Sequence, residues 1–226
     1  MNVEFALFAR IATRCGEIVE EPGAPEVLVT IYQGACAQPL ARYLAAMTKV
    51  DDATTRVNNA ESGLERLLED MDQQFRIARS AVGAMLPDTK LPATLKSQTT
   101  DTDKRKAIER LVALITPHAG QPWADTLLQG KFGQTAAVAI QQLNESIEAQ
   151  NALQKAKTDR AGSFDAAWSA YMRFKRLVRN TLGSTSRQYR RIHVRAASGI
   201  EEEEETSGPT DAGRAPPASA PASGAA

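Results

Sequence analysis

The sequence is poor in the residues from which disulfides, metal sites and many catalytic sites are built. Of its 226 residues, two are cysteine and two are histidine, and aromatic residues make up 5%. Two cysteines are too few for a disulfide scaffold in a chain of this size, so we interpret Cys15 and Cys36 as reduced thiols. The spacings Cys-x-x-Cys, His-x-x-x-His and Glu-x-x-His are all absent. We therefore expect neither a metal site nor a cofactor.

Long apolar runs are also missing from the sequence. No stretch approaches the roughly 18 apolar residues that a membrane-spanning helix needs, so we expect no membrane span. Glu4 and Arg10 interrupt the apolar N-terminus, which argues against a secretory signal peptide. A cytoplasmic location follows as the default expectation.

The most regular pattern is a heptad repeat in residues 39–86. Apolar residues recur there at alternating steps of three and four, which predicts a long helix in a bundle or coiled coil, opened by Pro39. Residues 49–63 are poor helix formers that could divide it in two. The heptad stays in phase across them, so we favour a single helix. The inward positions, named the seam below, are Leu40, Tyr43, Met47, Val50, Thr54, Val57, Glu61, Leu64, Leu68, Met71, Phe75, Ala78, Val82 and Met85.

Two polar residues, Thr54 and Glu61, interrupt the seam. One interpretation is a polar layer that sets helix register, or a buried carboxylate site with Arg56 or Arg66 as partner. The alternative is a local drift of the apolar stripe, which would turn Ala60 inward and leave Glu61 in solvent. We favour the drift, because a buried glutamate is costly unless it is paired.

Two shorter segments precede the seam. Residues 4–20 have the spacing of an amphipathic helix. Such a helix near the N-terminus could dock on a membrane surface or a partner, but we favour packing on the bundle because its basic face is thin. Residues 26–38 fit a strand or a helix by propensity. No second convincing strand exists to pair with them, so we favour the helix.

Residues 86–182 continue the helical pattern. The first helix here begins with Thr100 and Asp103 as a capping-box-like pair, the second has its best position for a kink or break at KFGQT, residues 131–135, and the third begins with Ser163 as its N-cap. The predicted segments are a linker over 86–100 and helices over 100–116, 123–160 and 163–182.

Charge is distributed unevenly, although 27 basic and 27 acidic residues give a formal net charge of zero. Residues 160–195 contain nine Lys or Arg and one acid, whereas residues 201–226 contain six acids and one Arg. Clustered arginines neutralise phosphates, and the acidic run Glu201–Glu205 could compete with such a ligand. The candidate contacts for nucleic acid or another anion are Arg173, Lys175, Arg176, Arg179, Arg187, Arg190, Arg191 and Arg195.

The segment LVRNTLGSTSRQY contains Gly183, Ser186 and Tyr189 at intervals of three. Gly183 is placed to end a helix, and Thr185 with Gln188 could cap one more turn. Over about 25 residues this region resembles uncharacterised bacterial helical proteins whose last helix ends in a Gly-x-x-Ser-x-x-Tyr-like segment. The resemblance implies a helical bundle and carries no activity.

The predicted fold class is all-α: an elongated antiparallel helical bundle with one or two long helices and a disordered C-terminal tail. The tail is predicted because GPTDAGRAPPASAPASGAA has no large apolar residue to offset the entropy of ordering. We expect three parts: an N-terminal helix with a connecting segment (1–34), the helical bundle (35–197) and the tail (198–226).

For function, the sequence favours a non-enzymatic structural or protein-interaction role, with self-association through the seam, since so long a heptad can exceed what one small bundle covers. The alternative is nucleic-acid binding through the basic segment Arg173–Arg195; we interpret Trp168 as a core anchor and not as a base-stacking platform. An enzyme is least favoured. Glu61 has no evident partner base or nucleophile, and His118 fits a solvated loop.

Overall fold

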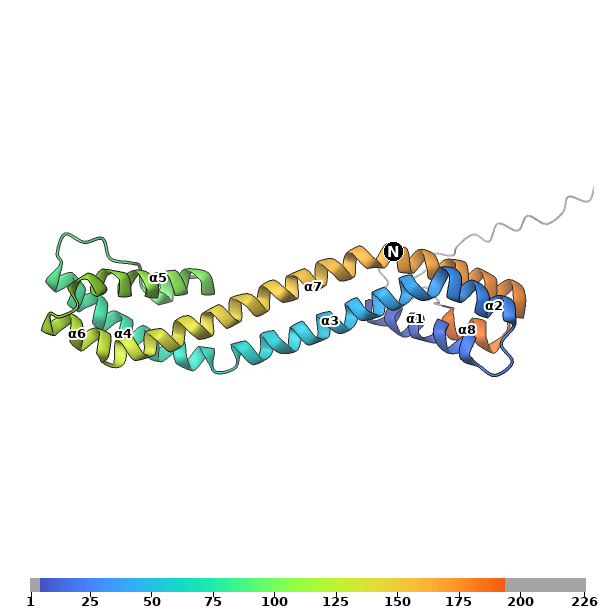
Figure 1. Ribbon diagram of the computed structural model, residues 1–226, viewed down its shortest axis with the longest axis horizontal. Helices are drawn as coiled ribbons and strands as arrows, with labels where there is room; N and C mark the ends of the chain where they lie inside the picture. Colours follow the sequence, from blue (N-terminus) through green and yellow to red (C-terminus); the bar gives the residue numbers. More distant parts are fainter. Residues whose placement is uncertain (1–4, 194–226) are drawn as a thin grey trace, which may run out of the picture. The chain divides into compact units, whose positions relative to one another are not determined.

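The computed structural model describes residues 5–193 (Figure 1). Contacts within the chain separate a unit of residues 1–193 from a unit of residues 194–226. The predicted disordered tail and the candidate contact Arg195 lie outside the described residues. Every regular element within residues 5–193 is helical, which confirms the all-α class and the preference for helix over strand in residues 26–38. In chain order the elements are α1 (Phe5–Glu20), α2 (Glu26–Ile31), the π-helical turn η1 (Tyr32–Cys36), α3 (Ala37–Glu61), α4 (Leu64–Met85), the 3-10 turn η2 (Leu95–Ser97), α5 (Asp101–Ile115), the 3-10 turn η3 (Thr116–His118), α6 (Pro122–Gln129), α7 (Lys131–Leu182) and α8 (Arg187–Ile192).

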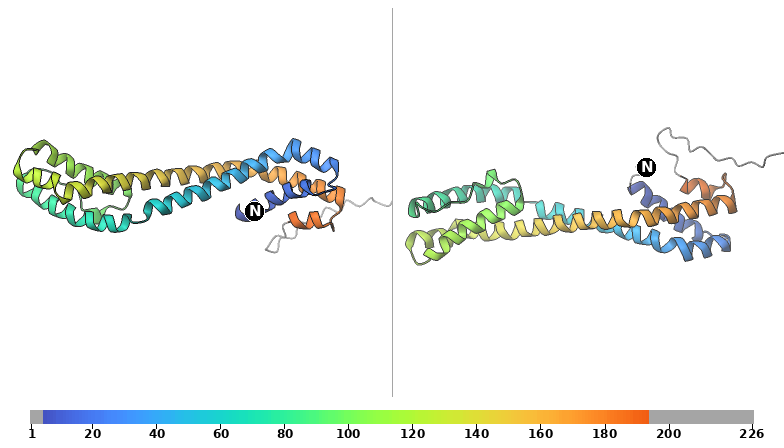
Figure 2. Two further views of the ribbon diagram at one scale, coloured as in Figure 1. Left: turned by 60° about the horizontal axis from the view of Figure 1, so that its bottom comes forward. Right: turned by 90° about the horizontal axis from the view of Figure 1, so that it is seen from above.

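Helix α7 organises this unit. Its 52 residues correspond to a length of about 78 Å at 1.5 Å per residue. Helices α3 and α4 run antiparallel to it, one after the other (Figure 1). Helices α4, α5 and α6 surround the first part of α7, and α1, α2 and α8 surround its last part; we name these groups the α4–α6 end and the α1–α8 end. Between them α3 and α7 lie side by side as a pair (Figure 2). The elongated, antiparallel bundle is therefore confirmed.

The preference for one helix over residues 39–86 is wrong. Helix α3 ends at Glu61 and α4 begins at Leu64. Between them Gly63 has a φ of 86°, a left-handed conformation that glycine adopts without the steric penalty of other residues. The heptad stays in phase because both helices bury their apolar faces against α7. The unbroken heptad pattern therefore reflects the contact of both helices with α7 and not a single continuous helix.

Pro39 does not open the long helix. The backbone is helical from Glu26 through α2, η1 and α3, and Pro39 is the third residue of α3. The π-helical turn Tyr32–Cys36 lies directly before it, and the N–H of Ala37 donates to the carbonyl of Tyr32, five residues back. Since proline has no N–H and its ring clashes with the preceding turn, the local change of register allows the helix to continue through it.

The two predicted helices over 123–160 and 163–182 are also wrong in their division. The break expected at KFGQT lies one residue earlier, at Gly130, since α6 ends at Gln129 and α7 begins at Lys131. A Cβ on Gly130 would lie 2.3 Å from the carbonyl oxygen of Thr126. No break follows, because α7 continues through Ser163. That residue is buried, and its hydroxyl donates to the carbonyl of Arg160 at 2.9 Å instead of capping a new helix.

Most seam residues on both helices are buried within the chain, including Leu40, Tyr43, Met71 and Phe75. Within residues 5–193 most of the seam therefore faces other parts of the same chain and is not open to a second copy. At the polar positions the drift is confirmed: Ala60 is half-buried and Glu61 is exposed, where it accepts a hydrogen bond from Gln150 at 3.2 Å.

Thr54 is exposed as well, and its hydroxyl donates to the carbonyl of Val50 at 2.8 Å. Ala53 takes the buried position, where it packs with Val50, Leu153 and Ala156 between α3 and α7. The middle of the bundle is therefore held by a few small apolar residues, whereas each end has a larger core.

The two ends have different cores. In the α4–α6 end Met71, Phe75, Ile108 and Leu111 belong to one buried, mainly aliphatic cluster, which Phe132 of α7 joins. The α1–α8 end is built from aromatic rings. The ring of Phe8 lies at centroid distances of 4.9 Å from Tyr43, 5.4 Å from Trp168 and 5.7 Å from Tyr171.

These contacts confirm two expectations about the α1–α8 end. Helix α1 packs on the bundle, with Phe8, Ile11, Cys15 and Ile18 buried. Trp168 is a core anchor, as its contact with Phe8 shows.

Candidate functional site

The last helix returns against the first because of two residues after α7. Gly183 ends α7 with a φ of 88°. Ser186, and not Thr185 as the sequence suggested, is the N-cap of α8: its hydroxyl oxygen accepts from the N–H of Tyr189 at 3.2 Å. The buried face of α8 carries Tyr189 and Ile192. Because one face is buried, the opposite face of this short helix turns its basic residues outward.

Helix α8 is tied to α1 by polar contacts of Arg191. Its guanidinium forms ion pairs with Glu17 and Glu21, and its carbonyl oxygen accepts from Nη1 of Arg14 at 3.1 Å. Gln188 adds a hydrogen bond to Glu21 at 3.0 Å. The tyrosine hydroxyl of Tyr171 on α7 donates to the carbonyl of Ile192 at 2.8 Å. These bonds fix the position of α8 on both α1 and α7.

An open hollow of about 850 Å³ lies where the two helices meet, and we name it the arginine groove. Arg191 is neutralised by the carboxylates of Glu17 on α1 and of Glu21, the residue directly after α1. The other three arginines are exposed and form no ion pair with any residue in the described range. The groove therefore has an excess of positive charge. Its lining residues are Arg14, Glu17, Thr185, Arg187, Arg190 and Arg191.

The structure divides the basic residues predicted from the sequence. Arg187 and Arg190 lie in the groove, and Arg191 lines it while holding α8 in place. Lys175 is half-buried on α7. The exposed members on the last turns of α7 are Arg173, Arg176 and Arg179.

Sequence reasoning missed Arg14. It lies on α1 and joins the groove across a sequence separation of 177 residues from Arg191. Its only local signal was a position on the polar face of the amphipathic helix. Nothing in that signal indicates which basic segment the face would meet.

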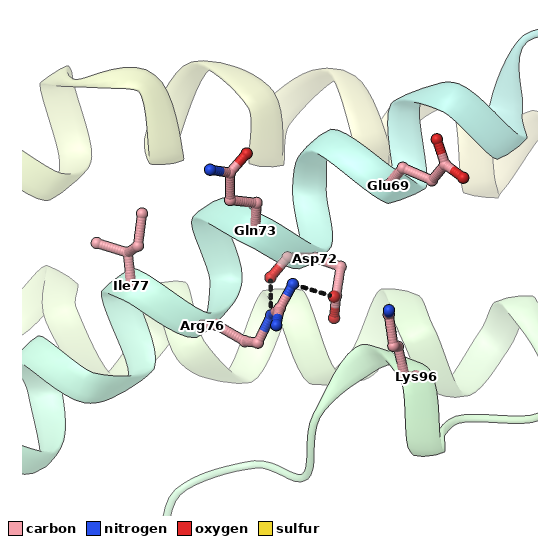
Figure 3. A pocket seen from close by; sticks show the side chains of 6 residues that line it. All are labelled: Glu69, Asp72, Gln73, Arg76, Ile77 and Lys96. Atoms are coloured by element: carbon pink, nitrogen blue, oxygen red, sulfur yellow. Dashed lines mark hydrogen bonds and ion pairs between the residues drawn. The ribbon is translucent and has the colours of Figure 1, made fainter.

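A second hollow of about 590 Å³ lies over α4 and η2 (Figure 3). Asp72 is 4% exposed, and one of its carboxylate oxygens lies 3.0 Å from a guanidinium nitrogen of Arg76. The Asp and Arg sit one helical turn apart, a spacing that sequence reasoning could have noticed. Glu69 and Lys96 also line the hollow. Acidic and basic residues balance there, so this hollow has no excess charge with which to attract an ion.

The two cysteines are buried and carry free thiols. Burial raises the pKa of the Cys15 thiol, and the neighbouring Cys36 raises it further. Burial also raises the pKa of Cys36, with Arg173 acting in the opposite direction. The Cys36 thiol donates to the carbonyl of Ala170 at 3.4 Å. Protonated, enclosed thiols are poor nucleophiles, so neither residue is a candidate for covalent catalysis.

His118, the other residue weighed from the sequence, is half-buried and its ring lies 5.5 Å from that of Trp123.

Within residues 5–193 no three His, Cys, Asp or Glu side chains are grouped as metal ligands. In the same range no helix has the length and apolar character to cross a membrane. Comparison with protein-family models, curated proteins and solved structures finds no match.

Proposed function

We propose that the protein is a non-enzymatic interaction scaffold that holds two helical ends apart and contacts protein partners through them. The observation that carries this proposal is the continuity of α7 from the α4–α6 end to the α1–α8 end. A helix bonded along its whole length transmits position between its ends better than a loop does. The paired middle of α3 and α7 then acts as a spacer.

The exposed apolar side chains offer contact positions for a partner. Val27 and Ile31 are 48% and 39% exposed and lie one turn apart on α2. Because the seam is covered by α7, we place self-association at this α2 face and no longer at the seam. A second copy of the chain is the first partner to test.

The experiment is light-scattering mass measured over a concentration series. We expect the wild-type mass to increase with concentration and the Val27→Ser/Ile31→Ser double variant to remain monomeric. Val138→Ser on α7 is the matched control, because Val138 is 50% exposed and lies away from α2 in the chain. A wild-type protein that stays monomeric at every concentration would refute self-association.

The second candidate function is contact with nucleic acid through the basic segment Arg173–Arg195. It is supported by the exposure of Arg173, Arg176 and Arg179 on α7 and of two further arginines on α8. Arginine neutralises backbone phosphates, and the affinity then falls as salt rises. Titration of a mixed-sequence DNA duplex at two salt concentrations tests it: binding that weakens with salt supports the role, and no binding at low salt refutes it.

A further inference from the structure

We propose that the arginine groove between α1 and α8 binds the phosphate backbone of a nucleic acid, with Arg14, Arg187 and Arg190 as the contacting residues. This inference rests on the second candidate function and deepens it. It moves the site from the basic segment alone to a surface that needs the first helix as well.

The first argument is charge. Arg191 has its positive charge satisfied by Glu17 and Glu21. By occupying these carboxylates, it also reduces their repulsion of an incoming phosphate. Three exposed guanidinium groups remain around the hollow, none of them ion-paired with a residue of the described chain. The lining therefore favours an anion.

The second argument is hydrogen bonding. A guanidinium presents five N–H donors in a planar fork that matches the oxygens of a phosphate. Arg14 uses Nη1 to hold the carbonyl of Arg191 at 3.1 Å, which leaves its other donors for a ligand. The Thr185 hydroxyl lines the same hollow and can donate as well. The groove thus combines charge with directed donors.

The third argument is preorganisation. Arg14 is held by its bond to Arg191, and α8 is held by Arg191, Gln188 and Tyr171. The apolar face of α8 is buried through Ile192. A ligand would therefore find the two helices already in place and would have to order only the ends of the arginine side chains, which lowers the cost of binding.

The form of the groove favours a polymer over a small phosphate compound. It is an open hollow of about 850 Å³, larger than a single phosphate fills, and its arginines come from two helices. Three further exposed arginines lie on the last turns of α7, the helix that α8 packs against. A linear polyanion has several linked phosphates with which to occupy so open a hollow. No lining residue is aromatic, so we expect contacts to phosphate and not to bases, without sequence preference.

The experiment compares two triple variants of the full-length protein with the same change in charge. One is Arg14→Gln/Arg187→Gln/Arg190→Gln in the groove, and the other is Arg173→Gln/Arg176→Gln/Arg179→Gln on α7. Binding of a fluorescent mixed-sequence DNA duplex is measured by anisotropy over a range of salt concentrations. Circular dichroism checks that each variant is as helical as the wild type.

We expect the groove variant to lose at least about tenfold in affinity at low salt. The slope of log K against log salt should become shallower by about 2 to 3, because each phosphate contact contributes about 0.9. The α7 variant should lose less. If the groove variant is less helical, the Arg187→Gln/Arg190→Gln double variant replaces it, because that change leaves the contact between Arg14 and Arg191 intact.

Three outcomes would overturn the inference. If the α7 variant loses binding while the groove variant keeps it, the nucleic-acid role survives and the groove does not. If the wild type binds no duplex at low salt, both fail. If pyrophosphate displaces the duplex at concentrations where chloride of equal ionic strength does not, the groove selects compact phosphate anions and the polymer assignment is wrong.

Discussion

Replacing Phe8 with alanine should lower the free energy of unfolding by about 3–5 kcal/mol, the range for removing a buried phenyl ring. Phe8 has no exposed surface. Its ring lies 4.9 to 5.7 Å from the rings of Tyr43, Phe164, Trp168 and Tyr171. Burying a phenylalanine removes about 150–250 Å² from water, which at about 25 cal/mol per Å² gives an upper bound of about 4–6 kcal/mol. The two estimates agree.

Urea unfolding followed by tryptophan fluorescence measures this effect where it occurs. The chain has two tryptophans, of which Trp168 lies 5.4 Å from Phe8 and Trp123 belongs to α6 at the other end. In a Trp123→Phe background the signal reports on the α1–α8 end, and in a Trp168→Phe background on the α4–α6 end. Phe8→Ala should strongly lower the urea midpoint reported by Trp168 and should lower the midpoint reported by Trp123 less. The reason is that few buried residues join the two cores.

Val138→Ala is the control for Phe8→Ala, since Val138 is 50% exposed and exposed substitutions usually change stability by less than about 0.5 kcal/mol. If Phe8→Ala lowered the free energy of unfolding measured through Trp168 by less than about 1 kcal/mol, the packing of α1 on α7 would be contradicted. Because α1 supplies Arg14 and Glu17, it would also remove the basis for the arginine groove.

Three further measurements test other parts of the structure. Gly63→Ala should lower the free energy of unfolding by about 1–2 kcal/mol, since φ is 86° there. Gly162→Ala in α7 should instead raise it by about 0.5–1 kcal/mol, because an added Cβ meets nothing within 4 Å. If urea titrations showed both variants changing the free energy of unfolding in the same direction, this reasoning would be wrong. Thr100→Ala should cost about 1 kcal/mol by the same assay, because it removes the acceptor of the α5 N-cap; an unchanged midpoint would argue against the cap. Cys15 and Cys36 should react with a disulfide reagent only on unfolding. Burial raises the pKa of both thiols above the ordinary 9.0. Above pH 9 the unfolded state therefore loses protons that the folded state keeps. The free energy of unfolding should be unaffected well below pH 9 and should fall as the pH rises above it.

Apolar periodicity was sufficient to predict which faces are buried and insufficient to predict where helices end. The seam named from sequence alone contains Leu40, Met71 and Phe75, all of them buried. The same pattern favoured a single helix, because a heptad records contact with α7 on either side of a break. Only Ser62 and Gly63, the latter with a left-handed backbone, separate α3 from α4, and a glycine in a sequence does not reveal its φ.

The opposite error occurred at Ser163, where a good N-cap residue suggested a new helix. Capping contributes about 1 kcal/mol, and a continuous helix keeps its backbone bonds and its packing on α3. Ser163 is buried within α7 and bonds to the carbonyl of Arg160. By contrast the cap at Thr100 was predicted correctly, since the preceding linker leaves that helix no upstream turn to extend. Local signals therefore decide a helix end only where no tertiary contact opposes them.

The arginine groove shows why only part of a proposed site can be predicted from a sequence. Arg187 and Arg190 belong to a basic segment that composition reveals, but Arg14 joins them from the other end of the chain. The contact exists because Gly183 turns the backbone after α7 and because Arg191 meets the carboxylates of Glu17 and Glu21. Each of these residues has an ordinary local explanation, as a helix end or a polar helix face. They come together only because the aromatic core docks α1 on α7, so a change in that core should affect the groove without touching any residue that lines it.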